Sequence, residues 1–302
     1  MSVTNEQSAA KSFLDTSVAY KLQTGTTIHR EYLSKAIPKN WYINNYVRME
    51  YYRTCLIAWI YLYFESADTI YRTFGDALKS YAEGFGRESK TVVNIVSSME
   101  LDGYSFSKPS EKEFCRQKLQ DFIFEMALQF RDIFIDMGKD PTKCARVPHP
   151  IKLPDEPTTR DEVLRKVAWA FDQEKDCRSR CTIQNLFQAG SYKNKMDMIA
   201  SLSPVGKTKM PLERINEAIK DANAQPSDIT CKLCGKMGDA VIATVLDSAW
   251  KLHSLDTVHK PISEAIKQAY EIHPSNTALK NSSQSTALPA TPTAPASSST
   301  PK

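Results

Sequence analysis

The sequence predicts an α/β fold, a three-layer α/β/α sandwich with a short parallel sheet and a large helical insertion. Short strand-like segments lie near both ends of the chain, and each is followed by a helix-like segment, as in a parallel sheet covered on both faces. Between them, residues 75–225 read as mainly helical. In this architecture ligands gather at the carboxyl ends of the strands.

The first half of the chain gives three element predictions. SFLDTSV (12–18) reads as a short strand ending at a turn. Residues 41–74 begin ambiguously and become a long apolar helix around CLIAWIYLYF (55–64). Residues 111–138 space their apolar side chains as an amphipathic helix does, and Gly138 is the expected stop.

The second half alternates helices and strands. Residues 160–176 and 210–224 carry helical periodicity, and SDITCKL (227–233) reads as a short strand. A helix is expected from about Asp239, then the strand-like LHSL, and a last helix over 262–273.

These elements divide the chain into three parts. We expect residues 10–74 and 226–274 to form one α/β core, with 75–225 as a helical insertion or second helical subdomain. Residues 275–302 are rich in Ser, Thr, Pro and Ala and hold no aromatic residue. Such a segment buries too little apolar surface to offset its ordering entropy, so disorder is expected.

The composition of the chain indicates its expected cellular compartment. The 302 residues are 41% hydrophobic, which is enough for a sizeable core, and no apolar run reaches the roughly 18 residues of a membrane span. The N-terminus lacks the features of a signal peptide, and seven irregularly spaced cysteines favour reduced thiols. We therefore expect a cytoplasmic protein without a membrane partner. The net charge of +4 permits a nucleic-acid partner without arguing for one.

Four acids lie where strands end or helices begin: Asp15, Glu50, Asp239 and Asp256. They converge if the strands that precede them are neighbours. Clustered carboxylates raise one another's pKa, so such a cluster persists mainly around a divalent cation. Oxygen ligands suit Mg²⁺ or Mn²⁺, and phosphodiester hydrolysis is the chemistry that uses them.

The segments that carry these acids resemble a PIN domain, a ribonuclease fold found in many bacterial toxins. The matching pieces are FLDTSV, VRMEYYR, GDAVIATVL and LHSLDTVHKPI. In that family an Asp before Thr or Ser ends the first strand, a Glu sits on an early helix, an Asp opens a helix reading D-A-x-I-A, and another Asp follows a later strand. The resemblance implies that Asp15, Glu50, Asp239 and Asp256 are catalytic and bind the metal, while Thr16 and Ser17 position the metal and the first Asp.

The resemblance also implies a function. It predicts a metal-dependent endoribonuclease that cuts single-stranded RNA with Mg²⁺ or Mn²⁺. By the same resemblance, a protein inhibitor and a second copy of the chain, in a homodimer, are expected partners. Two features differ from the minimal family pattern: the inserted block has no counterpart, and Asp256 stands in SLD where T-x-D is more usual.

Other interpretations stay open on the same residues. Asp15 and Asp239 could simply cap helices or turns. The chain could be a non-catalytic PIN-like scaffold whose helical block binds protein or nucleic acid. It could also be a mainly helical interaction protein with no parallel sheet.

Cysteines and histidines give weaker candidates. Cys177, Cys181, Cys231 and Cys234 could hold a structural zinc ion, although Cys231 falls in a predicted buried strand, where cysteine is an ordinary apolar residue. His253 and His259 flank Asp256 and could reach a phosphate, or be exposed loop histidines.

A basic stretch of the helical block could face phosphate, or be a solvated charged face. Aromatic residues are interleaved with its lysines and arginines, which would suit single-stranded RNA. The GKT within SPVGKTKM is not a phosphate loop, because the upstream glycine is missing. The residues concerned are Arg178, Arg180, Phe187, Tyr192, Lys193, Lys195, Lys207 and Lys209.

Overall fold

The computed structural model describes residues 10–84, 105–142, 182–188 and 190–275, with Val96, Glu162, Leu164 and Ala278 as single residues. The helix predicted over 160–176 therefore lies outside the described residues except at two positions, both helical. The tail predicted to be disordered also lies outside them, apart from Ser275 and Ala278.

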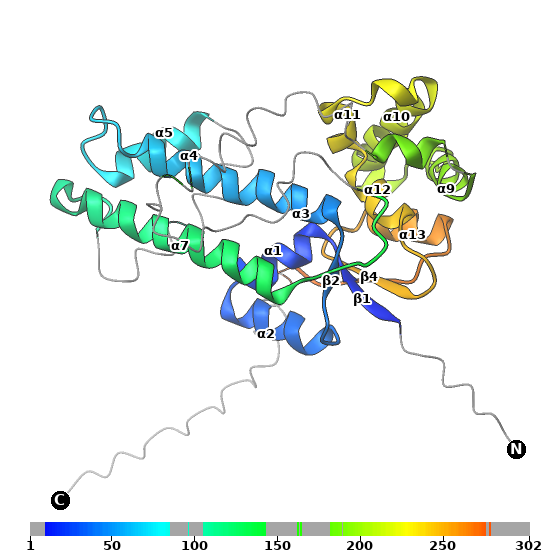
Figure 1. The fold of residues 1–302 in the computed structure, drawn as a ribbon, viewed down its shortest axis with the longest axis horizontal. Coiled ribbons are helices and arrows are strands. Elements are labelled where there is room, and N and C mark those ends of the chain that lie inside the picture. The colour runs from blue at the N-terminus through cyan, green and yellow to red at the C-terminus, as the bar shows by residue number, and fades with distance from the viewer. Residues whose placement is uncertain are drawn as a thin grey trace, which may run out of the picture.

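A five-stranded, all-parallel sheet lies at the centre of the fold (Figure 1). The strand order is β3-β2-β1-β4-β5, and Leu14 at the end of β1 pairs with His253 on β4. The sheet and its helices confirm the α/β class, consistent with the predicted sandwich, and exclude the all-helical alternative. The strands are β1 (Lys11–Leu14), β2 (Tyr42–Ile43), β3 (Ile135–Asp136), β4 (Trp250–Ser254) and β5 (Tyr270–Ile272).

The chain builds this sheet in two directions from its central strand. After β1 it adds β2 and β3 on one side, and it then returns to the other side of β1 for β4 and β5. The strand order therefore reverses between β1 and β4. In open parallel sheets, the crevice at the carboxyl ends of the strands at such a reversal is the usual ligand site.

The N-terminal helices agree with the sequence. The strand ends at Leu14 and a helix starts two residues later, while the apolar run at 55–64 lies within one continuous helical stretch that is buried at Trp59 and Ile60. A π-helical segment, Tyr52–Leu56, lies inside that stretch. The helices are α1 (Thr16–Thr24), α2 (Thr27–Ala36), α3 (Asn45–Tyr51) and α4 (Ile57–Glu65).

The long helix of the middle block ends earlier than predicted. It stops at Ile133 instead of Gly138, because Phe134 is extended and residues 135–136 join the sheet as β3. One strand of the sheet thus comes from within 75–225, while the division of the chain into core and insertion stays a prediction. The helices of this block are α5 (Phe74–Gly84), α7 (Lys112–Ile133), α9 (Gly190–Ala200) and α10 (Lys209–Ala224), the last as predicted.

Two predictions near the C-terminus are wrong. Residues 227–233 form no strand: the Thr230 side chain accepts a hydrogen bond from the Leu233 N–H and caps α11 (Cys231–Lys236). The last helix, α13 (His259–Ala265), does not reach residue 273, because Lys267 has a left-handed φ of 56° and β5 then pairs with β4. The helix expected at Asp239 is present as α12 (Gly238–Thr244).

The arrangement places helices at both ends of the sheet (Figure 1). Helices α4, α5 and α7 extend away from the strands on one side, and α9, α10 and α11 gather on the other. In the described part of the chain, no helix combines the length and the apolar character needed to cross a membrane.

Candidate functional site

Asp15 lies directly after the central strand and is fixed by several donors. Its Oδ1 accepts hydrogen bonds from the N–H of Val18 at 3.0 Å and the hydroxyl of Ser17 at 2.7 Å, so it caps α1. Its Oδ2 accepts a hydrogen bond from the hydroxyl of Ser254 at the end of β4. The capping role that the sequence left open is therefore present, and the same carboxylate also faces β4.

A serine pair ties the ends of β1 and β4 together. The Ser17 hydroxyl accepts the N–H of Leu255 at 3.0 Å, and the Ser254 hydroxyl accepts the N–H of Asp256 at 2.8 Å. The SLD turn after β4 is thereby held against the start of α1. Ser17 positions the first Asp, as the resemblance implies, whereas Ser254 carried no signal in the sequence.

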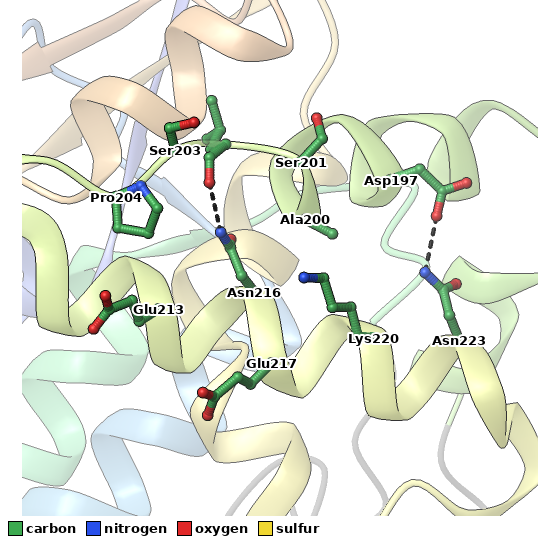
Figure 2. A pocket seen from close by; sticks show the side chains of 11 residues that line it. Asp197, Ala200, Ser201, Ser203, Pro204, Glu213, Asn216, Glu217, Lys220 and Asn223 are labelled. Atoms are coloured by element: carbon green, nitrogen blue, oxygen red, sulfur yellow. Dashed lines mark hydrogen bonds between the residues drawn. The ribbon is translucent and has the colours of Figure 1, made fainter.

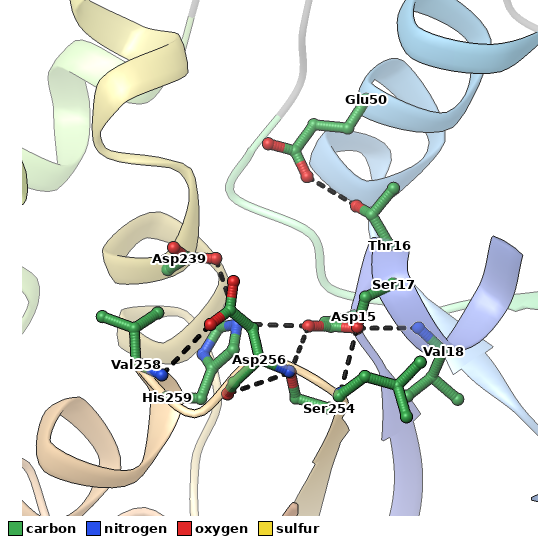
Figure 3. Close-up of polar contacts among 11 residues, drawn as sticks. Asp15, Thr16, Ser17, Val18, Glu50, Asp239, Ser254, Asp256, Val258 and His259 are labelled. Atoms are coloured by element: carbon green, nitrogen blue, oxygen red, sulfur yellow. Dashed lines mark hydrogen bonds and ion pairs between the residues drawn. The ribbon is translucent and has the colours of Figure 1, made fainter. Parts of the chain in front are cut away.

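His259 is the residue that connects the acids, and no role among them was assigned to it from the sequence. Its side chain is fully buried, with Nε2 3.3 Å from Oδ2 of Asp15 and 3.2 Å from Oδ1 of Asp239 (Figure 3). Burial alone would lower the pKa of His259, but the negative charges of Asp239 and Asp15, whose carboxylates lie 3.2 and 3.3 Å from Nε2, raise it to about 10. The imidazole is therefore a cation at neutral pH.

The same contact acts on Asp15. Burial would raise the pKa of this carboxyl, but the close positive charge of His259, together with the hydrogen bonds from Ser254 and Ser17, holds it below its usual range. Asp15 is thus a carboxylate at neutral pH, and with His259 it forms a buried ion pair.

Glu50 reaches the cluster from α3. Its Oε2 accepts a hydrogen bond from the Thr16 hydroxyl at 2.5 Å, so Thr16 holds the Glu and Ser17 holds the Asp. Burial raises the pKa of Glu50 to about 7, and the negative charges of Asp239 and Asp15 add to this against the Thr16 hydrogen bond. A carboxyl that titrates near neutrality can exchange a proton under working conditions.

Asp239 and Asp256 form the exposed side of the cluster. The Asp239 side chain is 35% exposed and Asp256 is exposed, with its Oδ1 accepting the Val258 N–H at 3.2 Å. Loss of solvation and the negative charge of Asp239 raise the pKa of Asp256. All four predicted acids therefore lie within one electrostatic neighbourhood (Figure 3).

A pocket of about 970 Å³ opens next to Asp239 and Asp256. Its wall is otherwise strongly basic and comes from α10, α11 and the turn before α10. An anionic ligand could therefore reach the two acids along a positive surface. The charged side chains that line the pocket with the two acids are Lys207, Lys209, Arg214 and Lys236.

The four acids offer oxygen ligands of the kind that suit Mg²⁺ or Mn²⁺. Asp15 and Asp239 are in contact with the positive charge of His259, and Glu50 has a pKa of about 7, so only part of the negative charge of the cluster is uncompensated. Among the described residues, the acids do not bring three ligand atoms within 4.8 Å of one another. That spacing is compatible with Mg²⁺, which keeps several waters and takes few protein ligands. His259, and not open space, lies between Asp15 and Asp239.

A close backbone approach holds Glu50 in place. A Cβ on Gly238 would lie 2.6 Å from Oε1 of Glu50 and 3.1 Å from the Tyr46 hydroxyl, which is itself hydrogen-bonded to the carbonyl of Cys234. Any larger residue where α12 begins would therefore have to displace the Glu50 carboxylate. The reason for glycine as the first residue of GDAVIATVL is thus a packing contact, which the sequence alone does not reveal.

Gly238→Ala is expected to displace Glu50 and to destabilise the protein by about 1–3 kcal/mol, because the overpacking outweighs the helix preference of alanine. The matched control is Gly235→Ala in the preceding helix, where the nearest atom to an added Cβ is 3.9 Å away. Chemical denaturation of both variants measures the effect. Equal stability of the two variants would contradict the packing argument.

Several other sequence candidates have structural roles. His253 and His259 are both buried, so the interpretation as exposed loop histidines is wrong. Lys195 donates to the carbonyls of Thr244 and Leu246 at the end of α12.

Only some of the residues proposed to form an RNA-binding face on the helical block are placed to contact RNA. Lys193 pairs with Asp197 at 2.7 Å, and Phe187 is buried and cannot stack on a base. Arg178 and Arg180 lie outside the described residues. Lys207 and Lys209 line the pocket beside the acids, and Lys209 also lies 4.0 Å from Glu213. Tyr192 is partly buried against the core.

The structure describes only two of the four cysteines of the candidate zinc site. Cys177 and Cys181 lie outside the described residues. Cys231 is on helix α11 and partly exposed, so its placement in a buried strand was wrong, while Cys234 is buried.

A second pocket, of about 660 Å³, lies between α9 and α10 (Figure 2). None of the four acids lines it. Asp197 at its rim is paired with Lys193 and accepts a hydrogen bond from Asn223 at 2.8 Å, and Asn216 donates to the carbonyl of Leu202. The candidate site is therefore the acidic cluster.

Comparison of this chain with family models, with curated proteins and with solved structures found no match. The functional argument consequently depends on the site geometry.

Proposed function

We propose that this protein is a metal-dependent endoribonuclease that hydrolyses phosphodiester bonds of single-stranded RNA, with a PIN-like core. One observation carries the proposal: Asp15, Glu50, Asp239 and Asp256 gather around His259 where the strand order reverses between β1 and β4. The acids come from four distant segments of the chain. Such a convergence of like charges is costly unless a function uses it.

The acids divide into two roles in this proposal. Asp15, Asp239 and Asp256 would hold Mg²⁺ or Mn²⁺ in part through bridging water molecules, because the described acids do not bring three ligand oxygens within 4.8 Å of one another. When bound, the ion would lower the pKa of water and stabilise charge on the phosphate oxygens. Glu50, with a pKa of about 7, is suited to accept a proton from the attacking water. His259 fixes Asp15 and Asp239 in position and supplies a positive charge to the cluster.

The basic wall of the pocket supports a polyanionic substrate. Lys207, Lys209, Arg214 and Lys236 are all exposed and line the same pocket as two of the acids. Phosphate contacts of this kind position a nucleic-acid strand without reading its sequence. RNA and DNA of the same sequence, incubated with Mn²⁺, test the substrate class: cleavage of the RNA strand alone is expected, and equal cleavage of both strands would contradict the RNA assignment.

Lys236→Gln is expected to weaken binding of single-stranded RNA and to reduce its salt dependence, because one phosphate contact is lost. Lys232→Gln is the matched control, since Lys232 is exposed on the same helix but does not line the pocket. Fluorescence anisotropy at several salt concentrations measures both. Equal affinities of the two variants for RNA would contradict a role of the basic pocket residues in RNA binding.

One observation favours a second candidate, the non-catalytic scaffold. The His259 cation already compensates Asp15 and Asp239, so these two acids have a structural use without a metal ion. Thermal stability that does not change with Mg²⁺ or Mn²⁺, together with no cleavage, would support it. The protein inhibitor and the homodimer stay predictions.

A further inference from the structure

A cluster of two histidines and a glutamate lies at the edge of the sheet, apart from the four acids. His253 is on β4, and Glu271 pairs with it in register on β5, with His273 two residues further on. One potential ligand atom from each of the three lies within 4.8 Å of the other two. In the described part of the chain, this is the one group of three or more such residues that is this compact.

We propose that His253, Glu271 and His273 form a binding site for Zn²⁺ or a related divalent cation that prefers imidazole ligands. Two histidines and one glutamate are a known zinc ligand set, and a fourth position then stays open to water. The site would join the short edge strand β5 to β4.

The distances lie close to those that a zinc ion requires. Nδ1 of His253 is 3.0 Å from Nε2 of His273, and 3.9 Å from Oε2 of Glu271. Zn–N bonds of about 2.0–2.1 Å place neighbouring ligands about 3.3 Å apart in a tetrahedron. Binding therefore requires the two rings to move apart by about 0.3 Å. It also requires the ring proton that they share to leave this position, so that each histidine presents an unprotonated nitrogen to the ion.

Burial and protonation support the same assignment. The side chains of His253 and His273 are 1% and 0% exposed. The two nitrogens that face each other, Nδ1 of His253 and Nε2 of His273, share a hydrogen bond. Burial lowers the pKa of His253 to about 4, and burial also lowers the pKa of His273. Burial thus disfavours the charged form of both rings, and the neutral imidazole is the form that binds metals.

The neighbours of the cluster hold it in shape and leave a route from solvent. The Tyr32 ring packs edge-on to the His273 ring, and the backbone N–H of His273 donates a hydrogen bond to the Ser254 carbonyl at 2.8 Å. The Glu271 side chain is 37% exposed. Its Oε2 is paired with Lys251 at 2.6 Å, while Oε1 lies 3.9 Å from Nδ1 of His273.

The test uses the full chain, stripped with a chelator and titrated with Zn²⁺ by calorimetry, in an Asp239→Asn background that weakens the acidic site. One Zn²⁺ per chain and a rise in Tm are expected. Glu271→Gln and His273→Gln should each weaken binding by more than the roughly 10–100-fold that loss of an outer-shell partner costs. Glu264→Gln, an exposed carboxylate on α13, is the matched control and should bind like the background.

The absorption spectrum of the Co²⁺-loaded protein is a second test of the ligand set, and it does not require a variant. A four-coordinate spectrum without thiolate charge-transfer bands is expected. No binding of Zn²⁺, binding unchanged by Glu271→Gln, or a thiolate spectrum would overturn the proposal. Because Glu271 is partly exposed and glutamine keeps its shape, this variant decides the matter if His273→Gln fails to fold.

Discussion

Asp239→Asn is expected to reduce RNA cleavage by more than about 100-fold, since losing a direct metal ligand should cost at least as much as losing an outer-shell partner. Asparagine keeps the size of the side chain but lacks its charge. Asp239 is 35% exposed at the pocket, and its described contact is the ion pair with His259, so the fold should survive. Initial rates in Mn²⁺, with circular dichroism of the same samples, measure the effect.

Asp247→Asn is the control for this substitution. Asp247 is an exposed acid just beyond the same helix, and its Oδ1 accepts the Ala249 N–H at 2.9 Å. Its loss should leave cleavage unchanged. If Asp239→Asn cuts as fast as Asp247→Asn, the carboxylate at 239 has no part in the reaction.

His259→Gln is expected to destabilise the protein most near pH 6, by about 3 kcal/mol, because it leaves the buried Asp15 without its ionic partner. The folded pKa of His259, about 10, is raised above the ordinary value of 6.5. The stabilisation is therefore complete below pH 6.5 and is lost as the pH rises to about 10. Within that window the free energy of unfolding should fall by up to about 1.4 kcal/mol per pH unit.

Urea unfolding of wild type and His259→Gln between pH 6 and 10 measures this loss. Glu50 also lowers the stability as the pH rises, but its folded pKa of about 7 confines that contribution mostly to lower pH. Above pH 7.5 the slope therefore reports on His259. Parallel curves for the two proteins would show that the imidazole is not a buried cation.

The sequence predicted where the four acids lie better than it predicted the contacts that connect them. Strand-then-helix patterns around Asp15 and Asp256 placed both acids at carboxyl ends, and the sheet places β1 beside β4 as the prediction required. Asp239 lies at the start of a helix as predicted, although the strand predicted before it is not present. Local periodicity is sufficient for such positions, because each depends on a few consecutive residues.

The missed features depend on contacts between distant segments. His259 follows Asp256 by three residues, yet its partners at 15 and 239 come from other segments. The strands β3 and β5 have two and three residues, too few to show a period, and they exist because they pair with β2 and β4. The segment 227–233 was mistaken for a strand because Thr230 gives a cap whose signal is one side chain.

The most direct test of the central claim is cleavage of a mixed single-stranded RNA pool by the wild type in Mn²⁺, with and without EDTA, beside Asp15→Asn. Asparagine can still cap α1, and Asp239 still pairs with the buried His259, so the variant should fold. The account predicts that the wild type cuts, that EDTA stops it, and that folded Asp15→Asn is inactive. Cleavage that persists in EDTA, or equal behaviour of wild type and variant, would contradict an acidic metal-dependent nuclease site.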